Sequence, residues 1–404
     1  MASTGSPMPW AWTIRIREIH ETRQVRETRK EPSMADVISS LDSVTPEWLT
    51  SRLRETGMLK QGGILDVEIH PNPAFNSVAA HLEPVYSADT PADVPERLFI
   101  KIKQHHWGRD EVSFYRLAAG QKLPLPMLIP FIDGAYDEDT GVSHCLMLDV
   151  SGTHHAPVSR ARLLAGDGVP EEGELAGCVE ALAGLHAYWW EHPALRDGPA
   201  LGDGPVKIPT PFTDEESYMA EVRDQAEEWR RFSASAAAEL PRELVELYDC
   251  RIEALPTLWD RYLKHRIARS SKLTVCHSDC YFTQFLCPDD PETHGTYLSD
   301  LEEACIYLGA EDLVYLFATF WTREQRQENE RELRCLKRYY ETLVNRGVKD
   351  YSWDDLRRDY RLQLIWRVEL PVWDEQNGSS RDYWRPKMQC LADAYHDWDC
   401  AALL

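Results

Sequence analysis

Three polar residues between positions 273 and 302 have the types and the spacing that phosphoryl transfer requires. Asp279 follows a short apolar segment, Gln284 comes five residues later, and Asp300 follows a second such segment. In this reaction one carboxylate orients or deprotonates an attacking hydroxyl group, while an amide oxygen and a second carboxylate hold Mg²⁺ against the phosphates of a nucleotide. Taken alone, an Asp at a strand end is more often a turn residue that accepts hydrogen bonds from nearby backbone N–H groups. The chemical interpretation therefore needs support from other parts of the chain.

The residues around this set resemble the signature of a known enzyme family. The chain contains H-S-D at 277–279, four further residues, Gln284, and then D-L-E at 300–302. This arrangement is similar to the H-G-D-x-x-x-x-N motif, β-hairpin and later acidic pair of the aminoglycoside phosphotransferase and choline kinase-like family. The fold of that family is the fold of the protein kinases. The resemblance implies a catalytic loop at the first motif and a metal site shared with the second.

Each matching residue receives a role from the resemblance. Asp279 would be the catalytic base, Gln284 and Asp300 would bind the metal ion, and His277 would support the loop. Glu302 corresponds to the second acid of the family's later pair.

Two of the matches depart from the family pattern. Ser278 stands where the family has Gly, so we expect the backbone there not to need a positive φ. Gln284 stands where the family has Asn; it keeps the amide oxygen but adds a methylene and a rotatable bond, from which we expect looser metal geometry. These departures are the basis of an alternative hypothesis, a catalytically weak or inactive pseudokinase that binds nucleotides or partners.

Two lysines precede this region on one predicted strand. Lys101 follows three apolar residues and Glu111 comes ten residues later; they match the family's nucleotide-binding lysine and the helix acid that pairs with it. A lysine on a strand stays aimed at the α- and β-phosphates only if a carboxylate holds it. Lys103 shares the strand face and is the rival candidate. A charged residue on an exposed strand face is otherwise simply solvated.

Further segments fit the family in the same order along the chain. Residues 75–78 lie where the family has its phosphate-covering loop, although this segment contains no Gly. Residues 145–151 resemble the hinge strand whose backbone would bind adenine, and L-A-G-L-H-A-Y-W-W at 182–190 resembles a helix of the family in which His186 would be structural. The candidates for nucleotide contacts from these segments are Ser77, Met147, Leu148 and Asp149.

The acceptor side is indicated only by composition. The C-terminal segments are rich in tryptophan and acidic residues, and Trp373 and Asp374 are the candidates for substrate contact. Aromatic rings with carboxylates suit an amine-bearing or quaternary ammonium acceptor, through cation–π and charge attraction. The alternative is that these tryptophans pack helix against helix.

The periodicity of the chain indicates the elements that must position these residues. Alternating and apolar segments predict strands first, and helical periodicity dominates afterwards. The predicted strands are 64–70, 77–86, 97–103 and 143–150, with a helix at 110–119. The predicted later helices are 175–189, a helix from a capping box at 213–216 to about 232, 243–265 and 324–346. Two short strands, 273–276 and 296–299, interrupt the helices, and we expect them to be neighbours.

This order predicts an α+β, two-lobed, protein-kinase-like fold. We expect an N-terminal extension at residues 1–34, a nucleotide-binding lobe with a β-sheet and a helix at 35–150, and a larger, mainly helical lobe at 151–404 that carries the catalytic loop and the acceptor site. The length of 404 residues accommodates two lobes.

Composition excludes several other classes. The 44 basic and 67 acidic residues give a net charge of −23, which argues against a general nucleic-acid binder. No apolar run approaches twenty residues, so we expect no membrane span. The ten cysteines lack a disulfide framework spacing and no secretion signal is evident, which favours a reducing cytoplasm. The chain contains no P-loop, G-x-S-x-G or H-E-x-x-H motif.

A zinc site is the competing interpretation of the catalytic segment. Cys276, Cys280, Cys287 and His294 lie within twenty residues, but they include no C-x-x-C pair, and we do not favour zinc. The sequence therefore predicts transfer of the γ-phosphoryl group of ATP, or of GTP, to a hydroxyl group of a small molecule, with Mg²⁺. A protein side chain as acceptor is disfavoured because no activation segment follows Asp300. The sequence does not define the acceptor or the oligomeric state.

Overall fold

The computed structural model describes residues 37–404 apart from five short gaps at 73–76, 105–107, 121–126, 196–207 and 237–239. The extension expected at residues 1–34 lies outside the described residues. The first half of the segment expected to cover the phosphates, residues 75 and 76, lies outside them as well.

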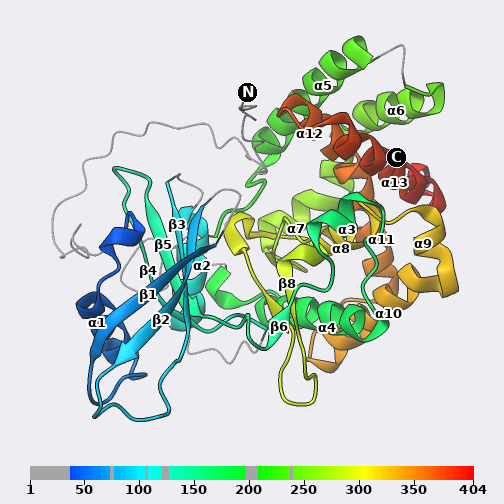
Figure 1. Cartoon of the computed structure of the whole chain (residues 1–404). Coiled ribbons are helices and arrows are strands. Elements are labelled where there is room, and N and C mark those ends of the chain that lie inside the picture. The colour runs from blue at the N-terminus through cyan, green and yellow to red at the C-terminus, as the bar shows by residue number, and fades with distance from the viewer. Residues whose placement is uncertain (1–36, 73–76, 105–107, 121–126, 196–207, 237–239) are drawn as a thin grey trace.

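A five-stranded antiparallel sheet forms the N-terminal part of the molecule (Figure 1). Its strands are β1 (Ile64–Asn72), β2 (Val78–Tyr86), β3 (Leu98–Lys103), β4 (Phe131–Tyr136) and β5 (Ser143–Leu148). They are ordered β1-β2-β3-β5-β4, so β3 lies in the middle with β2 and β5 on either side. The sequence patterns predict four of these strands at about these positions, and β4 is an addition.

Alternation along β3 decides which face of the sheet its lysines occupy. Alternate residues of this strand, such as Ile100, are buried in a core with α1 (Pro46–Glu55). Lys101 and Lys103 project to the opposite face, because successive side chains of a strand alternate. Figure 1 shows α1 on one side of the sheet and α2 (Gly108–Gly120) on the other. The lysines therefore lie on the face where α2 can supply a carboxylate.

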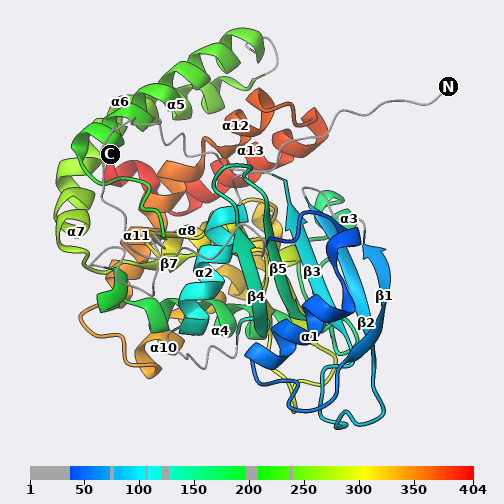
Figure 2. The same ribbon diagram turned by 90° about the vertical axis from the view of Figure 1, so that its left-hand side faces the viewer.

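The rest of the chain is mainly helical (Figures 1 and 2). Its helices are α3 (Arg160–Leu164), α4 (Glu172–Trp189), α5 (Glu215–Ala236), α6 (Arg242–Leu258), α7 (Lys264–Arg269), α8 (Ala310–Ala318), α9 (Arg323–Gln327), α10 (Arg331–Asn345), α11 (Trp353–Arg367), α12 (Leu370–Gln376) and α13 (Arg381–Asp397). A π-helical turn at Trp259–Leu263 joins α6 to α7. Helix α5 packs against α6 and α12, and α13 packs against α11 and α12. This arrangement confirms the two-lobed α+β fold expected from the sequence.

Two small antiparallel sheets carry the segment from 273 to 307. Their strands are β6 (His154–His155), β7 (Thr274–Cys276), β8 (Phe285–Pro288), β9 (Tyr297–Leu298) and β10 (Cys305–Tyr307). Strand β7 pairs with β10, while β8 lies between β6 and β9. The expectation that the strands near 273–276 and 296–299 are neighbours is therefore wrong. The hairpin β8–β9 closes locally, and β7 takes the later strand β10 as its partner.

Two helix boundaries also differ from the expectation. The single helix expected at 324–346 is divided into α9 and α10, because Asn329 and Glu330 have φ values of 50° and 54°. The cap expected at Thr213 lies one residue later: the Asp214 carboxylate accepts the backbone N–H of Ser217 at 2.8 Å, and α5 begins after it. A short polar side chain in either position satisfies an N-terminal N–H group, so the sequence pattern does not separate them.

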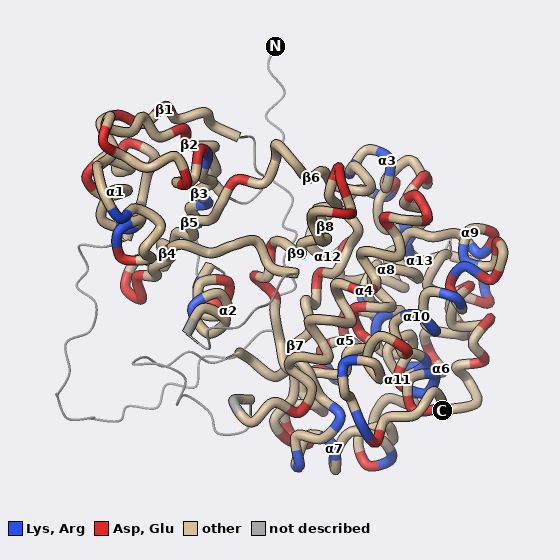
Figure 3. Tube along the Cα trace, turned by 90° about the horizontal axis from the view of Figure 1, so that it is seen from below, with Lys and Arg blue, Asp and Glu red and all other residues tan. Residues whose placement is uncertain are grey.

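The hydrophobic core consists of a small cluster in the sheet and a large one in the helical part. The small cluster fills the space between the sheet and α1, and the large one also includes residues of α2. None of the helices in the described part of the chain has the length and apolar composition that a bilayer span needs. Acidic positions are spread over both parts of the molecule (Figure 3), as the strongly negative net charge predicts.

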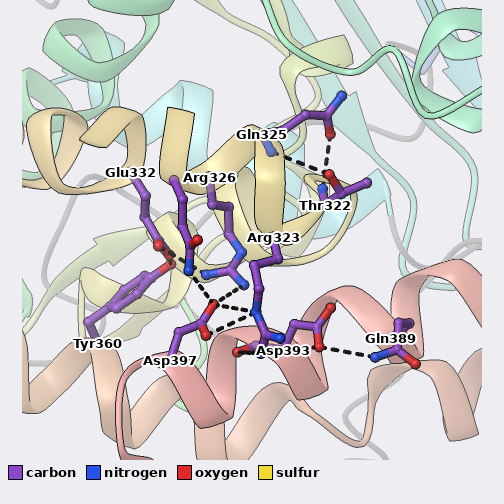
Figure 4. A network of polar contacts seen from close by, with 10 residues as sticks. Thr322, Arg323, Gln325, Arg326, Glu332, Tyr360, Gln389, Asp393 and Asp397 are labelled. Atoms are coloured by element: carbon purple, nitrogen blue, oxygen red, sulfur yellow. Dashed lines mark hydrogen bonds and ion pairs between the residues drawn. The ribbon is translucent and has the colours of Figure 1, made fainter. Parts of the chain in front are cut away.

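A buried polar network fixes the C-terminal helix α13 (Figure 4). Arg326 is 1% exposed; its Nη1 lies 3.1 Å from Glu332 Oε2, and its Nη2 lies 2.8 Å from Asp397 Oδ2. Arg323 Nε lies 3.0 Å from Asp397 Oδ1, and the Tyr360 hydroxyl donates to Glu332 Oε1 at 2.6 Å. Charge-assisted bonds of this kind are the stronger ones in proteins. They tie α13 to α9, α10 and α11.

Candidate active site

A single buried carboxylate, that of Asp312 at the start of α8, holds the loop that follows β7. Its Oδ2 accepts the backbone N–H of His277 at 2.7 Å, and its Oδ1 accepts that of Ser278 at 2.8 Å. The ring of His186 on α4 lies 3.0 Å from Oδ2 and contacts the Tyr339 hydroxyl at 2.6 Å. Although burial alone would raise it, hydrogen bonds and charge from the His186 ring lower the pKa of Asp312. The loop is therefore anchored by an ionised group inside the protein.

The geometry of this anchor overturns one expectation. Ser278 has a φ of 66°, so the left-handed conformation that Gly would favour is retained here by a residue with a side chain. Its hydroxyl lies 3.0 Å from Cys305 Sγ on β10. Both N–H groups of the turn must point at Asp312, and this requirement sets the backbone irrespective of the residue type. The prediction that Ser278 removes the need for a positive φ was wrong.

Sequence reasoning missed Asp312 itself. It stands 33 residues after Asp279, outside the stretch that carries the motif, next to Glu311 at the start of a segment that is otherwise apolar. An acid inside an apolar helix is the available signal, since a buried charge needs partners. The role of His186 as a packed residue is consistent with its contacts, since it is fully buried and bonded on both ring nitrogens.

The structure brings Asp279, Gln284 and Asp300 together. Gln284 Nε2 lies 3.2 Å from Asp279 Oδ2 and 3.4 Å from Asp300 Oδ2. The ring of His277 lies beneath them, with Nε2 2.8 Å from the carbonyl oxygen of Ser299. Asp300 has a φ of 59°, a conformation that Asp tolerates better than most residues. The β8–β9 hairpin thus returns the chain so that Asp300 faces the loop residues Asp279 and Gln284.

The lysines of β3 reach the same place from the sheet. Lys101 Nζ lies 2.9 Å from Glu111 Oε2 and also contacts Asp300. Lys103 Nζ is 3.9 Å from Glu111 Oε2 and pairs instead with Glu302. Between the two candidates, Lys101 therefore has the closer contact with the helix acid. Each lysine neutralises one of the two acids of the D-L-E segment.

The two aspartates differ in their electrostatic environment. Burial raises the pKa of Asp279 to about 6, against the opposing effect of the His277 ring. For Asp300, burial would raise the pKa, but the charges of Lys101 and then Lys103 hold it well below its ordinary value. Asp300 is therefore held in its ionised form, whereas Asp279 takes up a proton more readily than an exposed carboxylate does. A pair of acids with pKa values driven apart by their surroundings is typical of sites that move protons.

These side chains line one cavity of about 480 Å³. The sheet side of its wall includes Lys101, Glu111 and Phe99, and the expected nucleotide contacts Ser77, Met147, Leu148 and Asp149 also lie in the wall.

Much of the polar capacity of the expected hinge is already used within the protein. The backbone N–H of Leu148 donates to Pro130, and that of Asp149 donates to Arg97. The Asp149 carboxylate contacts the His81 ring at 2.8 Å and the Arg97 guanidinium at 3.1 Å. A purine bound against this segment would meet its other backbone groups.

The family model that matches the chain is the phosphotransferase enzyme family (APH), over residues 87–356. This span contains β3, α2, the catalytic segment and Asp312, and it is well over half of the chain. The chain belongs to this family. A comparison with curated proteins found no significant match.

Several solved structures are similar to this phosphotransferase-family chain at low identity. Choline kinase LicA from Streptococcus pneumoniae has 13% identity and a TM-score of 0.42, covering 87% of this chain and 98% of its own. The GDP complex of aminoglycoside 2'-phosphotransferase-IIIa has 12% identity and a TM-score of 0.45, with coverages of 87% and 99%. Macrolide 2'-phosphotransferase MphH from Brachybacterium faecium has 13% identity and a TM-score of 0.44, with coverages of 85% and 97%.

The donor set of this phosphotransferase fits a hard cation such as Mg²⁺. Glu111, Asp300 and Glu302 place carboxylate oxygens within 4.8 Å of one another, but lysines pair with Glu111 and Glu302. Asp300 Oδ2 faces the Gln284 amide, and a half-turn of that amide presents its oxygen in place of its nitrogen. Oxygen ligands of this kind are those that Mg²⁺ prefers. Among the described residues, the zinc set of Cys276, Cys280, Cys287 and His294 does not form a cluster.

The two expected acceptor residues do not line the cavity of this phosphotransferase. Asp374 on α12 is 3% exposed and lies 2.7 Å from Lys387 Nζ, and Trp373 precedes it outside the wall. The helical side of the wall instead includes Tyr281, Phe320 and Tyr383. The aromatic character expected of this region is present, but it comes from other residues.

Proposed function

We propose that this phosphotransferase transfers the γ-phosphoryl group of ATP, or of GTP, to a hydroxyl group of a small molecule. The observation that carries the proposal is the convergence of Asp279, Gln284 and Asp300 in one cavity beside the Lys101–Glu111 pair. The lobes expected at 35–150 and 151–404 would then meet at this cavity, because β5 ends at Leu148.

The phosphate end of the cavity is positioned by Lys101. Glu111 holds the ammonium group at 2.9 Å, so the side chain is already ordered before a nucleotide arrives. Asp300 and Gln284 would hold Mg²⁺, which supplies neutralisation of phosphate charge when it is bound. Lys101 contacts Asp300 here; with a nucleotide bound, the lysine would face the phosphates and Asp300 would be available to hold the metal ion.

Asp279 is the residue that would accept the proton of the attacking hydroxyl. Its pKa of about 6 leaves it ionised at pH 7 and above, with a basicity greater than that of an exposed carboxylate. General-base catalysis is most effective when the pKa lies near the working pH. Before the Gln284 amide turns its oxygen towards a metal ion, its Nε2 contacts the Asp279 carboxylate at 3.2 Å and limits the rotation of that group.

The test is a nucleotide-consumption screen across hydroxylated small molecules, with and without Mg²⁺, run on wild type and Asp279→Asn. We expect Mg²⁺-dependent consumption that requires one acceptor class, reduced about 100- to 10,000-fold in the variant. Wild-type turnover in Asp279→Asn would refute the assignment of the base. Failure of ATP and GTP to raise the melting temperature with Mg²⁺ would refute the proposal in favour of the pseudokinase.

A further inference from the structure

A lysine of the chain occupies an aromatic cage in the helical wall. Lys387 Nζ lies 4.3 Å from the ring centroid of Tyr383, 5.2 Å from that of Phe320 and 5.5 Å from that of Tyr281. The same ammonium group lies 2.7 Å from Asp374 Oδ2, and the whole residue is fully buried. Three rings and a carboxylate around one position are the chemistry that binds an ammonium ligand. In this protein the ammonium group at that position belongs to the chain's own Lys387.

The hydrogen-bonding capacity of this lysine is used up within the cage. Its ammonium group has three donors, and it contacts the Asp374 carboxylate, the Tyr383 hydroxyl at 3.0 Å and the Tyr281 hydroxyl at 3.3 Å. Lys387 therefore acts on a ligand through its charge and through the two tyrosines, and not by direct donation. It is a positioning residue.

The cage forms the wall beside the expected base. Tyr281, Phe320 and Tyr383 line the same cavity as Asp279, and the Tyr281 backbone N–H donates to the carbonyl oxygen of Asp279 at 3.0 Å. A molecule that brings a hydroxyl group to Asp279 must lie against these rings. It meets rings whose attraction for cations is already satisfied by Lys387, and the Asp374 carboxylate behind these rings is already paired with that lysine.

Displacement of the lysine by a ligand is opposed by the fold. Tyr383 and Lys387 stand four residues apart on α13, so one helix face sets both the ring and its cation. The far end of this helix is fixed through Asp397 by the Arg326 network (Figure 4). A rigid helix with a buried ion pair does not exchange its own ammonium for that of a substrate without leaving Asp374 unpaired.

We propose that Lys387 is the built-in cation of the acceptor wall and that it excludes cationic acceptors. The acceptor is an alcohol whose portion next to the reacting hydroxyl carries no positive charge. This inference deepens the proposed function, since it rests on the cavity being the acceptor site. It replaces the amine-bearing or quaternary ammonium acceptor that the composition of the C-terminal segments had suggested.

The test uses tetramethylammonium as the probe and tert-butanol as an uncharged control of similar shape, on the full chain without nucleotide. Lys387→Ala empties the cage and leaves Asp374 unpaired, so we expect tetramethylammonium to raise its melting temperature saturably, and tert-butanol to do so much less. Wild type should show no saturable shift with either probe. The double variant Lys387→Ala/Asp374→Asn should not show this rise in melting temperature with tetramethylammonium. A cation-specific shift in wild type, or none in Lys387→Ala, overturns the proposal.

A second variant keeps the test decisive if the alanine variant does not fold. Lys387→Met fills the same space without charge, and choline can be compared with its uncharged isostere 3,3-dimethyl-1-butanol by titration calorimetry. We expect the ratio of choline to isostere affinity to rise at least tenfold from wild type to Lys387→Met, a charge-selective change that a purely structural role does not produce. An unchanged ratio refutes the inference. Both assays omit nucleotide, so their outcome is independent of whether the protein transfers phosphate.

Discussion

Replacement of Asp279 by Asn should lower the rate of transfer about 100- to 10,000-fold and at the same time stabilise the protein. Burial raises the pKa of this carboxyl group from 3.8 to about 6, and a difference of about two pKa units corresponds to about 3 kcal/mol. The raised pKa means that the folded state disfavours the ionised form. Above pH 6 the Asp279 carboxyl group ionises freely in the unfolded chain, whereas burial opposes its ionisation in the folded protein. The wild type is therefore less stable there by this amount. Asn carries no charge and keeps an oxygen that can accept from Gln284.

The stability difference between Asp279→Asn and wild type should depend on pH in a defined direction. Below pH 3.8 the carboxyl group is protonated in both states and the difference between variant and wild type is close to zero. The advantage of Asp279→Asn grows as the pH rises from about 4 to about 6, and it is complete above that. Urea unfolding at pH 4.5, 5.5 and 7.5 measures the free energy of unfolding directly. An advantage of equal size at all three values, or a variant less stable than wild type at pH 7.5, would show that burial does not control this group.

Four further predictions concern other parts of the site and its supports. Lys101→Met should lower kcat/KM at least about 100-fold, because a preorganised cation is lost. A fall of kcat by the same factor at saturating nucleotide would show that the lysine positions the phosphates, whereas an unchanged kcat would show that it contributes to binding alone. Asp312→Asn should reduce the free energy of unfolding by about 3 kcal/mol, since one backbone N–H of the loop then faces an amide N–H₂, and an unchanged urea midpoint would contradict the anchor. Arg326→Met should cost about 3–5 kcal/mol, because it leaves the buried Glu332 carboxylate without its charged partner, whereas Arg230→Met, at an exposed ion pair with Glu227, should leave the midpoint unchanged. Chelation by EDTA should remove the nucleotide-dependent rise in melting temperature, and persistence of the full rise would argue against a metal held by Asp300.

The parts of the site that the sequence could predict are those set by local pattern. Strand alternation puts Lys101 and Lys103 on one face, and the resemblance to the family singles out Lys101. The spacing of Asp279 and Gln284 in one loop matches the family motif. These follow from short-range geometry, which a motif records directly. The strands around them were found for the same reason, because apolar alternation repeats over a few residues.

The parts that escaped prediction depend on partners far along the chain. The positive φ of Ser278 follows from Asp312, 34 residues away, and the role of Asp374 follows from Lys387 on another helix. The pairing of β7 with β10 joins segments that lie far apart in the sequence, which the local pattern of either strand does not specify. A buried ion pair leaves no periodic trace in either of its segments, since each member looks like an ordinary surface charge until the partner is known.

The residues around the cavity come from two stretches of the chain, and the C-terminal helix α13 belongs to the second. The match to the family model ends at residue 356, whereas α13 begins at Arg381 and brings Tyr383 and Lys387 to the wall. Under the proposals made above, substitutions on this last helix would change the acceptor side of the cavity. They would leave Lys101, Asp279 and Asp300 unaltered, because these residues lie in other elements of the chain.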